Sequence, residues 1–294
     1  MAAKTRWHAP IINEWRLFWL IVVPMSLAMI IAMLMTNLAT PEGVSSMISF
    51  SVRWSVPFLF LAFAASAMQK LFSAEWSRWL LRNRKILGLI FAAGMAWQVT
   101  FILWLVGWHR EYYIEEVYIL RDAIEGVIGY AFLIAMTITS FKAPRKWLGP
   151  KRWRLLHLWG IYFLWAYAFS TYWHSLFYYQ SPDWVDYLYY TAGIAAWAFR
   201  LAAWSSQRIK KADKTGSLAA RTPLPLGLCA AAVLVGLVGV ASGNLWGNLA
   251  YDHLWGYNAV AWFELYLPYW PLVPFLPLII AALGTLYYTR GRAA

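Results

Sequence analysis

Long runs of mostly apolar residues divide this chain into segments of helical length. They occupy residues 17–35, 47–68, 86–108, 126–141, 155–180, 187–207, 222–243 and 265–289. Two of them contain a charge, Arg53 near the start of the second and Arg200 near the end of the sixth. A helix needs roughly 20 mostly apolar residues to cross about 30 Å of hydrocarbon. Each run is about this long, the fourth somewhat shorter, so each is predicted to span as a helix. We therefore predict an all-α fold, a polytopic membrane helix bundle of about eight transmembrane helices.

The composition strengthens this prediction and narrows the chemistry. The chain is 62% apolar and only 13% charged, whereas soluble chains are roughly 25% charged. Its single cysteine, Cys229, excludes an internal disulfide and a thiolate metal cluster. The sequence has no Gly-rich nucleotide loop, no HExxH motif and no nucleophile elbow. We predict no catalytic residue, no metal site and no catalytic activity of the chain on its own.

The charged residues between the runs predict the orientation of the helices. All but three of the 25 Lys and Arg fall on one side of the membrane if the eight runs alternate in direction; the exceptions are Arg53, Arg110 and Arg121. Basic loops remain cytoplasmic, so both termini are predicted to be cytoplasmic in a bacterial-type inner membrane. The net charge of +12 then belongs to loops that face anionic lipid headgroups. We expect membrane lipid, and no nucleic acid, as a partner.

Aromatic residues make up 19% of the chain, with 21 Trp, and many stand where the runs end. This is typical of the aromatic belts at the two membrane interfaces. Packing against a flat pigment, quinone or macrocycle would require the same residues. The aromatic content does not separate these two interpretations.

Four regions follow from the pattern. Residues 1–44 form an N-terminal tail and an extra transmembrane helix, and residues 45–209 form a transmembrane core. Residues 210–227, rich in charge, Gly, Pro and Thr, are predicted to be a cytoplasmic linker after six helices. Residues 228–294 form a two-helix extension. Within it, the aromatic segment 242–270 is expected to lie along the outer membrane surface.

Three stretches of the core resemble a known family. They are WLLRNRKILGL at 79–89, ITSFKAPRKWLGPKRWRLLHL at 138–158 and YYQSPDWVDYLYYTAGIAAWAFRLAAW at 178–204. Together they resemble the ferric-reductase-like transmembrane domain. The closest branch is the heme-bearing membrane subunit of the periplasmic methionine-sulfoxide reductase system. The resemblance covers a little over half of the chain and implies a transmembrane cytochrome b, with histidines on the third and fifth helices holding heme between them.

Most of the implied heme ligands are missing from this sequence. The histidine of the third helix falls at Gln98, and the second histidine of the fifth helix falls at Ser170. The first histidine of the fifth helix is present as His157, near the cytoplasmic end. Gln98 and Ser170 both lie roughly 18–22 Å from that end at about 1.5 Å per residue. The outer heme is therefore expected to be lost, and Gln98 and Ser170 to hydrogen-bond across its former site.

Two other arrangements would retain one heme b. His174 lies one helical turn beyond Ser170, and Met95 lies one turn before Gln98, so a tilted heme with Met and His ligands is one alternative. His157 holding a five-coordinate heme is the other. Without heme, His157 is a structural imidazole and Met95 fills the core.

The resemblance and the missing ligands together favour a structural or assembly role. The predicted function is that of a subunit of a larger membrane redox or photosynthetic-type complex, with no cofactor of its own. The alternative is a transmembrane electron-transfer subunit that carries one b-type heme and serves a separate oxidoreductase partner. Heme content separates the two.

Overall fold

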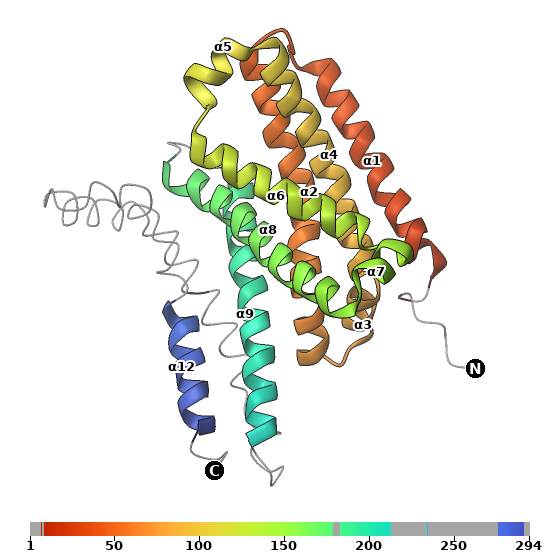
Figure 1. Cartoon of the computed structure of the whole chain (residues 1–294), viewed down its shortest axis with the longest axis vertical. Helices are drawn as coiled ribbons and strands as arrows, with labels where there is room; N and C mark the ends of the chain where they lie inside the picture. The colour runs from red at the N-terminus through yellow and green to blue at the C-terminus, as the bar shows by residue number, and fades with distance from the viewer. Residues whose placement is uncertain (1–6, 8, 179–182, 213–233, 235–275, 291–294) are drawn as a thin grey trace, which may run out of the picture. The chain divides into compact units, whose positions relative to one another are not determined.

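The computed structural model describes residues 7, 9–178, 183–212, 234 and 276–290. These residues are helical apart from short connections, and no strand occurs among them (Figure 1). The all-α prediction is therefore confirmed for this part of the chain. The chain divides into two compact units. One comprises Met1–Ala65 and Ala74–Tyr167, and the other comprises Ser66–Ser73 and Ala168–Ala294.

Among the described residues, three helices are long and apolar enough to cross a membrane: α1 (Glu14–Met35), α2 (Pro41–Leu71) and α4 (Arg84–Trp108). The shortest of them, α1, has 22 residues and is about 33 Å long at about 1.5 Å per residue. They coincide with the first three predicted runs. The pair α6 (Leu120–Ile138) and α7 (Lys142–Leu148) adds a fourth crossing if it forms one span.

α6 and α7 are separated by a sharp bend of 109°. Pro144 gives a physical reason for it. In a continuous helix Pro144 could not donate a backbone hydrogen bond to the carbonyl of Ser140, and its ring would clash there. In the first turn of a new helix, where Pro144 now lies, a missing N–H costs nothing. Gly149, with a φ of 77°, then ends α7 in the left-handed region that favours glycine.

The remaining long helices are α8 (Pro150–Tyr178), α9 (Trp184–Ala212) and the shorter α12 (Leu276–Arg290). They overlap the fifth, sixth and eighth predicted runs, and their crossing of the membrane stays a prediction. The other short elements are a 3-10 turn at Pro10–Ile12, α3 (Glu75–Arg82), α5 (Arg110–Tyr112) and a π-helical turn at Tyr113–Val117. Apart from Leu234, the run 222–243 and the outer segment 242–270 lie outside the described residues, as does most of the linker 210–227.

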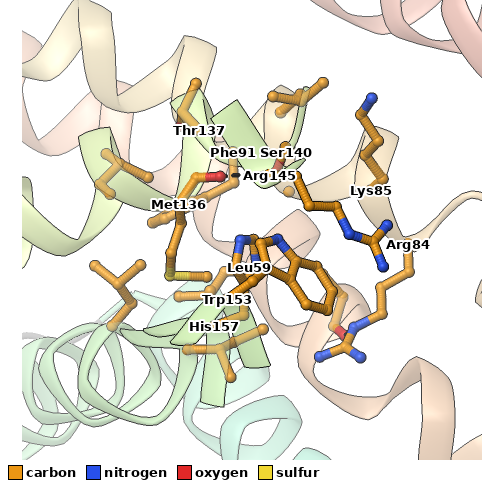
Figure 2. Close-up of a pocket in the computed structure, with 16 residues that line it drawn as sticks. Leu59, Arg84, Lys85, Phe91, Met136, Thr137, Ser140, Arg145, Trp153 and His157 are labelled. Carbon is orange, nitrogen blue, oxygen red and sulfur yellow. Dashed lines mark hydrogen bonds between the residues drawn. The ribbon is translucent and has the colours of Figure 1, made fainter. Parts of the chain in front are cut away.

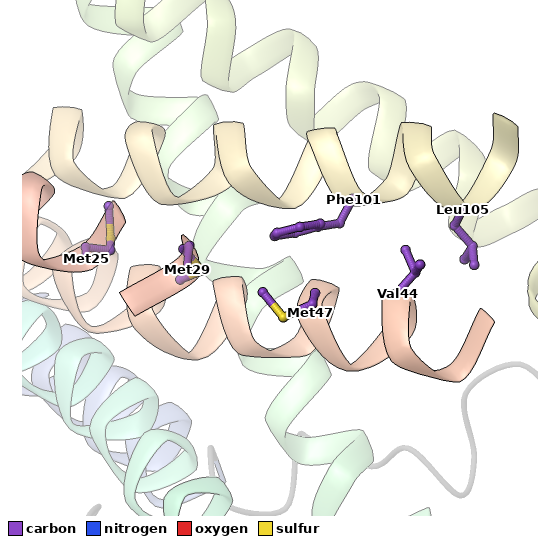
Figure 3. Packing of buried hydrophobic residues seen from close by; sticks show 6 residues of the cluster. All are labelled: Met25, Met29, Val44, Met47, Phe101 and Leu105. Atoms are coloured by element: carbon purple, nitrogen blue, oxygen red, sulfur yellow. The ribbon is translucent and has the colours of Figure 1, made fainter. Parts of the chain in front are cut away.

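The core of the first unit lies where α1, α2 and α4 meet (Figure 3). Each helix contributes two buried side chains to one cluster: Met25 and Met29, Val44 and Met47, and Phe101 and Leu105. Gly94 permits close approach nearby, because a Cβ placed there would lie 2.5 Å from the Cβ of Ser55 on α2. Small residues at such contacts are the usual means of close helix packing in membranes.

In the second unit α9 and α12 pack together through hydroxyl groups. The side-chain oxygens of Ser205 and Thr285 are 2.6 Å apart and buried. One turn further along each helix, Nε of Arg208 donates to Oγ1 of Thr289 at 2.8 Å. These bonds join the end of the predicted core to the C-terminal helix.

Candidate functional site

The first unit contains a cavity of about 260 Å³, which we call the basic cavity. It lies where the N-terminal ends of α4 and α8 meet the C-terminal end of α6, with α7 and α2 beside them. Its lining residues are Leu59, Ala62, Arg84, Lys85, Gly88, Leu89, Phe91, Leu133, Met136, Thr137, Ser140, Arg145, Trp153, His157, Ile161 and Leu164. Three of these are basic and none is acidic.

The three basic side chains lie on one side of the cavity, opposite Met136 (Figure 2). Nε of Arg84 donates to the backbone carbonyl of Ala62 at 2.9 Å, which fixes this guanidinium against the wall. The guanidinium carbon of Arg145 lies 4.1 Å from the ring centroid of Trp153, a cation–π contact that holds the charge without neutralising it. Nζ of Lys85 lies 5.0 Å from the ring centroid of Phe141.

His157 lies half-buried in the basic cavity and contacts Trp153, which also lines the cavity, and Thr139 at the end of α6. Its Nε2 is 3.0 Å from Oγ1 of Thr139, and its ring centroid is 4.5 Å from that of Trp153. The Thr139 hydroxyl also lies 2.7 Å from the carbonyl oxygen of Ala135, and the imidazole tautomer decides which of Thr139 and His157 donates in their contact. Trp153 donates to the carbonyl of Thr139 at 3.0 Å. These contacts give the imidazole partners within the chain, and its predicted structural role stays a prediction.

Gln98 lies deeper in the first unit and binds a residue on a neighbouring helix. The Tyr130 hydroxyl, on α6, donates to Oε1 of Gln98 at 2.7 Å, and it lies 3.2 Å from the carbonyl oxygen of Met95. Met95 itself is 8% exposed and accepts from the hydroxyl of Ser55 at 3.5 Å. Its predicted place in the core is confirmed.

The other two candidate residues lie on α8 in the second unit. Ser170 is exposed, and the predicted hydrogen bond between it and Gln98 joins residues of different units and stays a prediction. His174 is in the helix, and its side chain lies outside the described residues. The basic cavity therefore collects one of the four sequence-predicted site residues, His157.

The residues at the implied ligand positions do not fit a bis-ligated heme. Haem iron in proteins takes His, Cys, Met or Tyr as axial ligands, and the amide of Gln98 and the hydroxyl of Ser170 are not among these groups. Nε2 of His157 is 3.0 Å from Oγ1 of Thr139, within the chain itself. Gln98 and His157 instead contact the side chains of Tyr130 and Thr139.

Sequence reasoning missed Tyr130, Thr139 and the convergence of the basic residues. Tyr130 carried a signal, because a tyrosine hydroxyl within an apolar run needs a partner. No sequence signal beyond the charge bias of their loops indicated that Arg84, Lys85 and Arg145 would share a cavity. Their common cavity depends on the bend between α6 and α7.

Comparison of the chain with protein-family profiles, with curated proteins and with solved structures gave no match. The family of this all-helical chain is therefore not shown by these comparisons, and the ferric-reductase-like resemblance stays a prediction.

Proposed function

We propose that this protein is a structural subunit of a larger membrane redox or photosynthetic-type complex, built on a ferric-reductase-like core that no longer carries heme. The proposal rests on what the residues at two of the implied heme-ligand positions contact. Gln98 and His157 each hydrogen-bond to a side chain at or just beyond α6, at 2.7 and 3.0 Å. Polar side chains inside a membrane are costly unless they are used, and here they join helices.

The outer surface of α1 supports a role in assembly. Within its apolar stretch only 17% of the residues are buried in the chain itself. Met25 and Met29 face the core, whereas Trp19, Leu27 and Ile31 are each more than half exposed. The predicted extra N-terminal helix thus presents a wide apolar face to lipid or to a helix of a partner subunit.

The proposal is tested by purifying the tagged full-length chain from its native membrane in a mild detergent. A reduced-minus-oxidised absorption spectrum and pyridine hemochrome quantitation give the heme content, and native electrophoresis gives the size of the assembly. We expect a multi-subunit complex in which this chain, once isolated from its partners, contributes no b-type α-band.

A stoichiometric b-type heme on the isolated chain would overturn the proposal in favour of the electron-transfer alternative. His157→Ala and His174→Ala would then identify the ligand, because loss of a true axial ligand removes or shifts the α-band. A monomeric chain without heme and without partners would overturn both functions.

A further inference from the structure

The polarity of the basic cavity changes along the helix axes. Arg84 and Lys85 begin α4, and Thr137 and Ser140 lie at the end of α6. The apolar lining residues lie further inside the same helices: Leu89 and Phe91 on α4, Leu133 on α6, and Ile161 and Leu164 on α8. Arg84 and Phe91 are separated by roughly 10 Å along α4 at about 1.5 Å per residue. The cavity therefore runs from a cationic, hydroxyl-lined end to an apolar end.

This order of groups matches an anionic amphiphile. A phosphate bears several acceptor oxygens and pairs well with guanidinium and ammonium groups. None of the sixteen lining residues is a carboxylate. Lys85 and Arg145 are exposed, so the cationic end is accessible. The five inner apolar residues are all buried and would contact hydrocarbon.

The basic wall is held in place before any ligand arrives. Arg84 is fixed by its bond to the carbonyl of Ala62, and Arg145 by its contact with the Trp153 ring. Trp153 is in turn bonded to the backbone of Thr139. Preorganised charges lose little side-chain entropy on binding, which favours a specific site over loose attraction to a headgroup layer.

We propose that the basic cavity binds one anionic phospholipid, with its phosphate among Arg84, Lys85 and Arg145 and the first part of an acyl chain against Leu89, Ile161 and Leu164. The volume of about 260 Å³ is just below the range of roughly 300–1,000 Å³ for sites that enclose small molecules. It accommodates a headgroup and the upper part of a chain. The residues that would bind the lipid differ from Gln98 and His157, on which the proposed function rests, although His157 lines the same cavity.

Gly88 allows the cavity to be filled without damage to the fold. It lines the cavity, and a Cβ placed on it would meet nothing within 4 Å. Gly88→Leu should therefore insert a side chain into the cavity, and replacing glycine within a helix also favours the helix by up to about 1 kcal/mol. Gly107→Leu is the matched control, because Gly107 lies on the same helix, also has open space around a Cβ, and does not line the cavity.

Arg145 and Lys146 form a second matched pair, adjacent in α7, both exposed, with only Arg145 lining the cavity. The full-length chain and four variants, Gly88→Leu, Gly107→Leu, Arg145→Gln and Lys146→Gln, would be delipidated in an uncharged detergent. Each would be titrated with dioleoyl phosphatidylglycerol, dioleoyl phosphatidylcholine or inorganic phosphate, and native mass spectrometry would count bound lipid. We expect the first phosphatidylglycerol to bind at least roughly tenfold more tightly than phosphatidylcholine, as charge-assisted hydrogen bonds allow.

Gly88→Leu and Arg145→Gln should each weaken that first binding step about tenfold or more, whereas Gly107→Leu and Lys146→Gln should leave it unchanged. If a cavity variant and its matched control weakened the binding of the first phosphatidylglycerol equally, the basic cavity would not be the binding site. Equal affinity for the two lipids would overturn its charge selectivity and with it the proposal. Displacement of the lipid by submillimolar inorganic phosphate would show an anion site without a role for the acyl chain. Heme content is measured separately, so failure here leaves the test of the proposed function intact.

Discussion

Removing the hydroxyl of Tyr130 should weaken the packing of α6 against α4. Tyr130→Phe deletes the donor to Oε1 of Gln98, and Gln98→Met deletes the acceptor while keeping a side chain of similar length. At 2.7 Å the bond has the usual length of an O–H···O contact. The two residues are 32 positions apart in the sequence, so the contact belongs to the tertiary structure.

The expected magnitude follows from the environment of the pair. Interhelical hydrogen bonds in membranes contribute on average about 0.6 kcal/mol, and at most about 1.7 kcal/mol, to the free energy of unfolding. Both side chains are half-buried, so a group left without its partner has partial access to others. We expect each single variant to lose about 1 kcal/mol and the coupling energy between them to be roughly 0.5–1.5 kcal/mol.

The assay is a double-mutant cycle on the purified chain in mixed micelles, with unfolding by a denaturing detergent followed through tryptophan fluorescence. Thr100→Val is the control. Thr100 lies on α4, is exposed, and donates its hydroxyl to the carbonyl of Ala96 in its own helix at 2.9 Å, so its loss should not affect contacts between helices.

Two results would refute this reasoning. A coupling energy near zero would mean that the two side chains act independently, and Tyr130→Phe with unchanged stability would mean that the bond contributes nothing. Either outcome would remove the main support for a structural role of the position that the family resemblance assigns to a heme ligand.

Two further predictions concern close contacts elsewhere. Gly94→Ala should destabilise the first unit by roughly 1–3 kcal/mol, the usual cost of overpacking, because the new Cβ would lie 2.5 Å from that of Ser55. Gly88→Ala is the control and should be neutral or stabilising, because a Cβ there meets nothing within 4 Å. Unfolding curves in which Gly88→Ala is the less stable variant would contradict this packing. Thr285→Val should lower the unfolding free energy of the second unit by about 0.6–1.7 kcal/mol, because it breaks the buried hydroxyl contact to Ser205. Unchanged protection of α12 from a protease would show that this contact does not hold the helix.

The sequence alone determined the helices and the residues that needed an explanation. Apolar runs of spanning length predicted α1, α2 and α4, because a chain in lipid must satisfy its backbone hydrogen bonds within each run. The resemblance pointed to Gln98, Ser170 and His157 as positions of interest. The orientation in the membrane, the eight crossings and the loss of the outer heme are also predictions of the sequence.

Only the tertiary structure decided the partners of those residues. Tyr130 and Thr139 became visible as partners of Gln98 and His157 once α6 was placed against its neighbours. The basic cavity arose because the bend after α6 brings Arg145 beside charges that begin α4. A hydrophobic pattern specifies which helix faces are buried. It contains no information on how far each helix is rotated about its axis or on the bend between α6 and α7, which together determine the neighbours of a side chain. Packing sets both, through the close approach at Gly94 and the turn that Pro144 imposes.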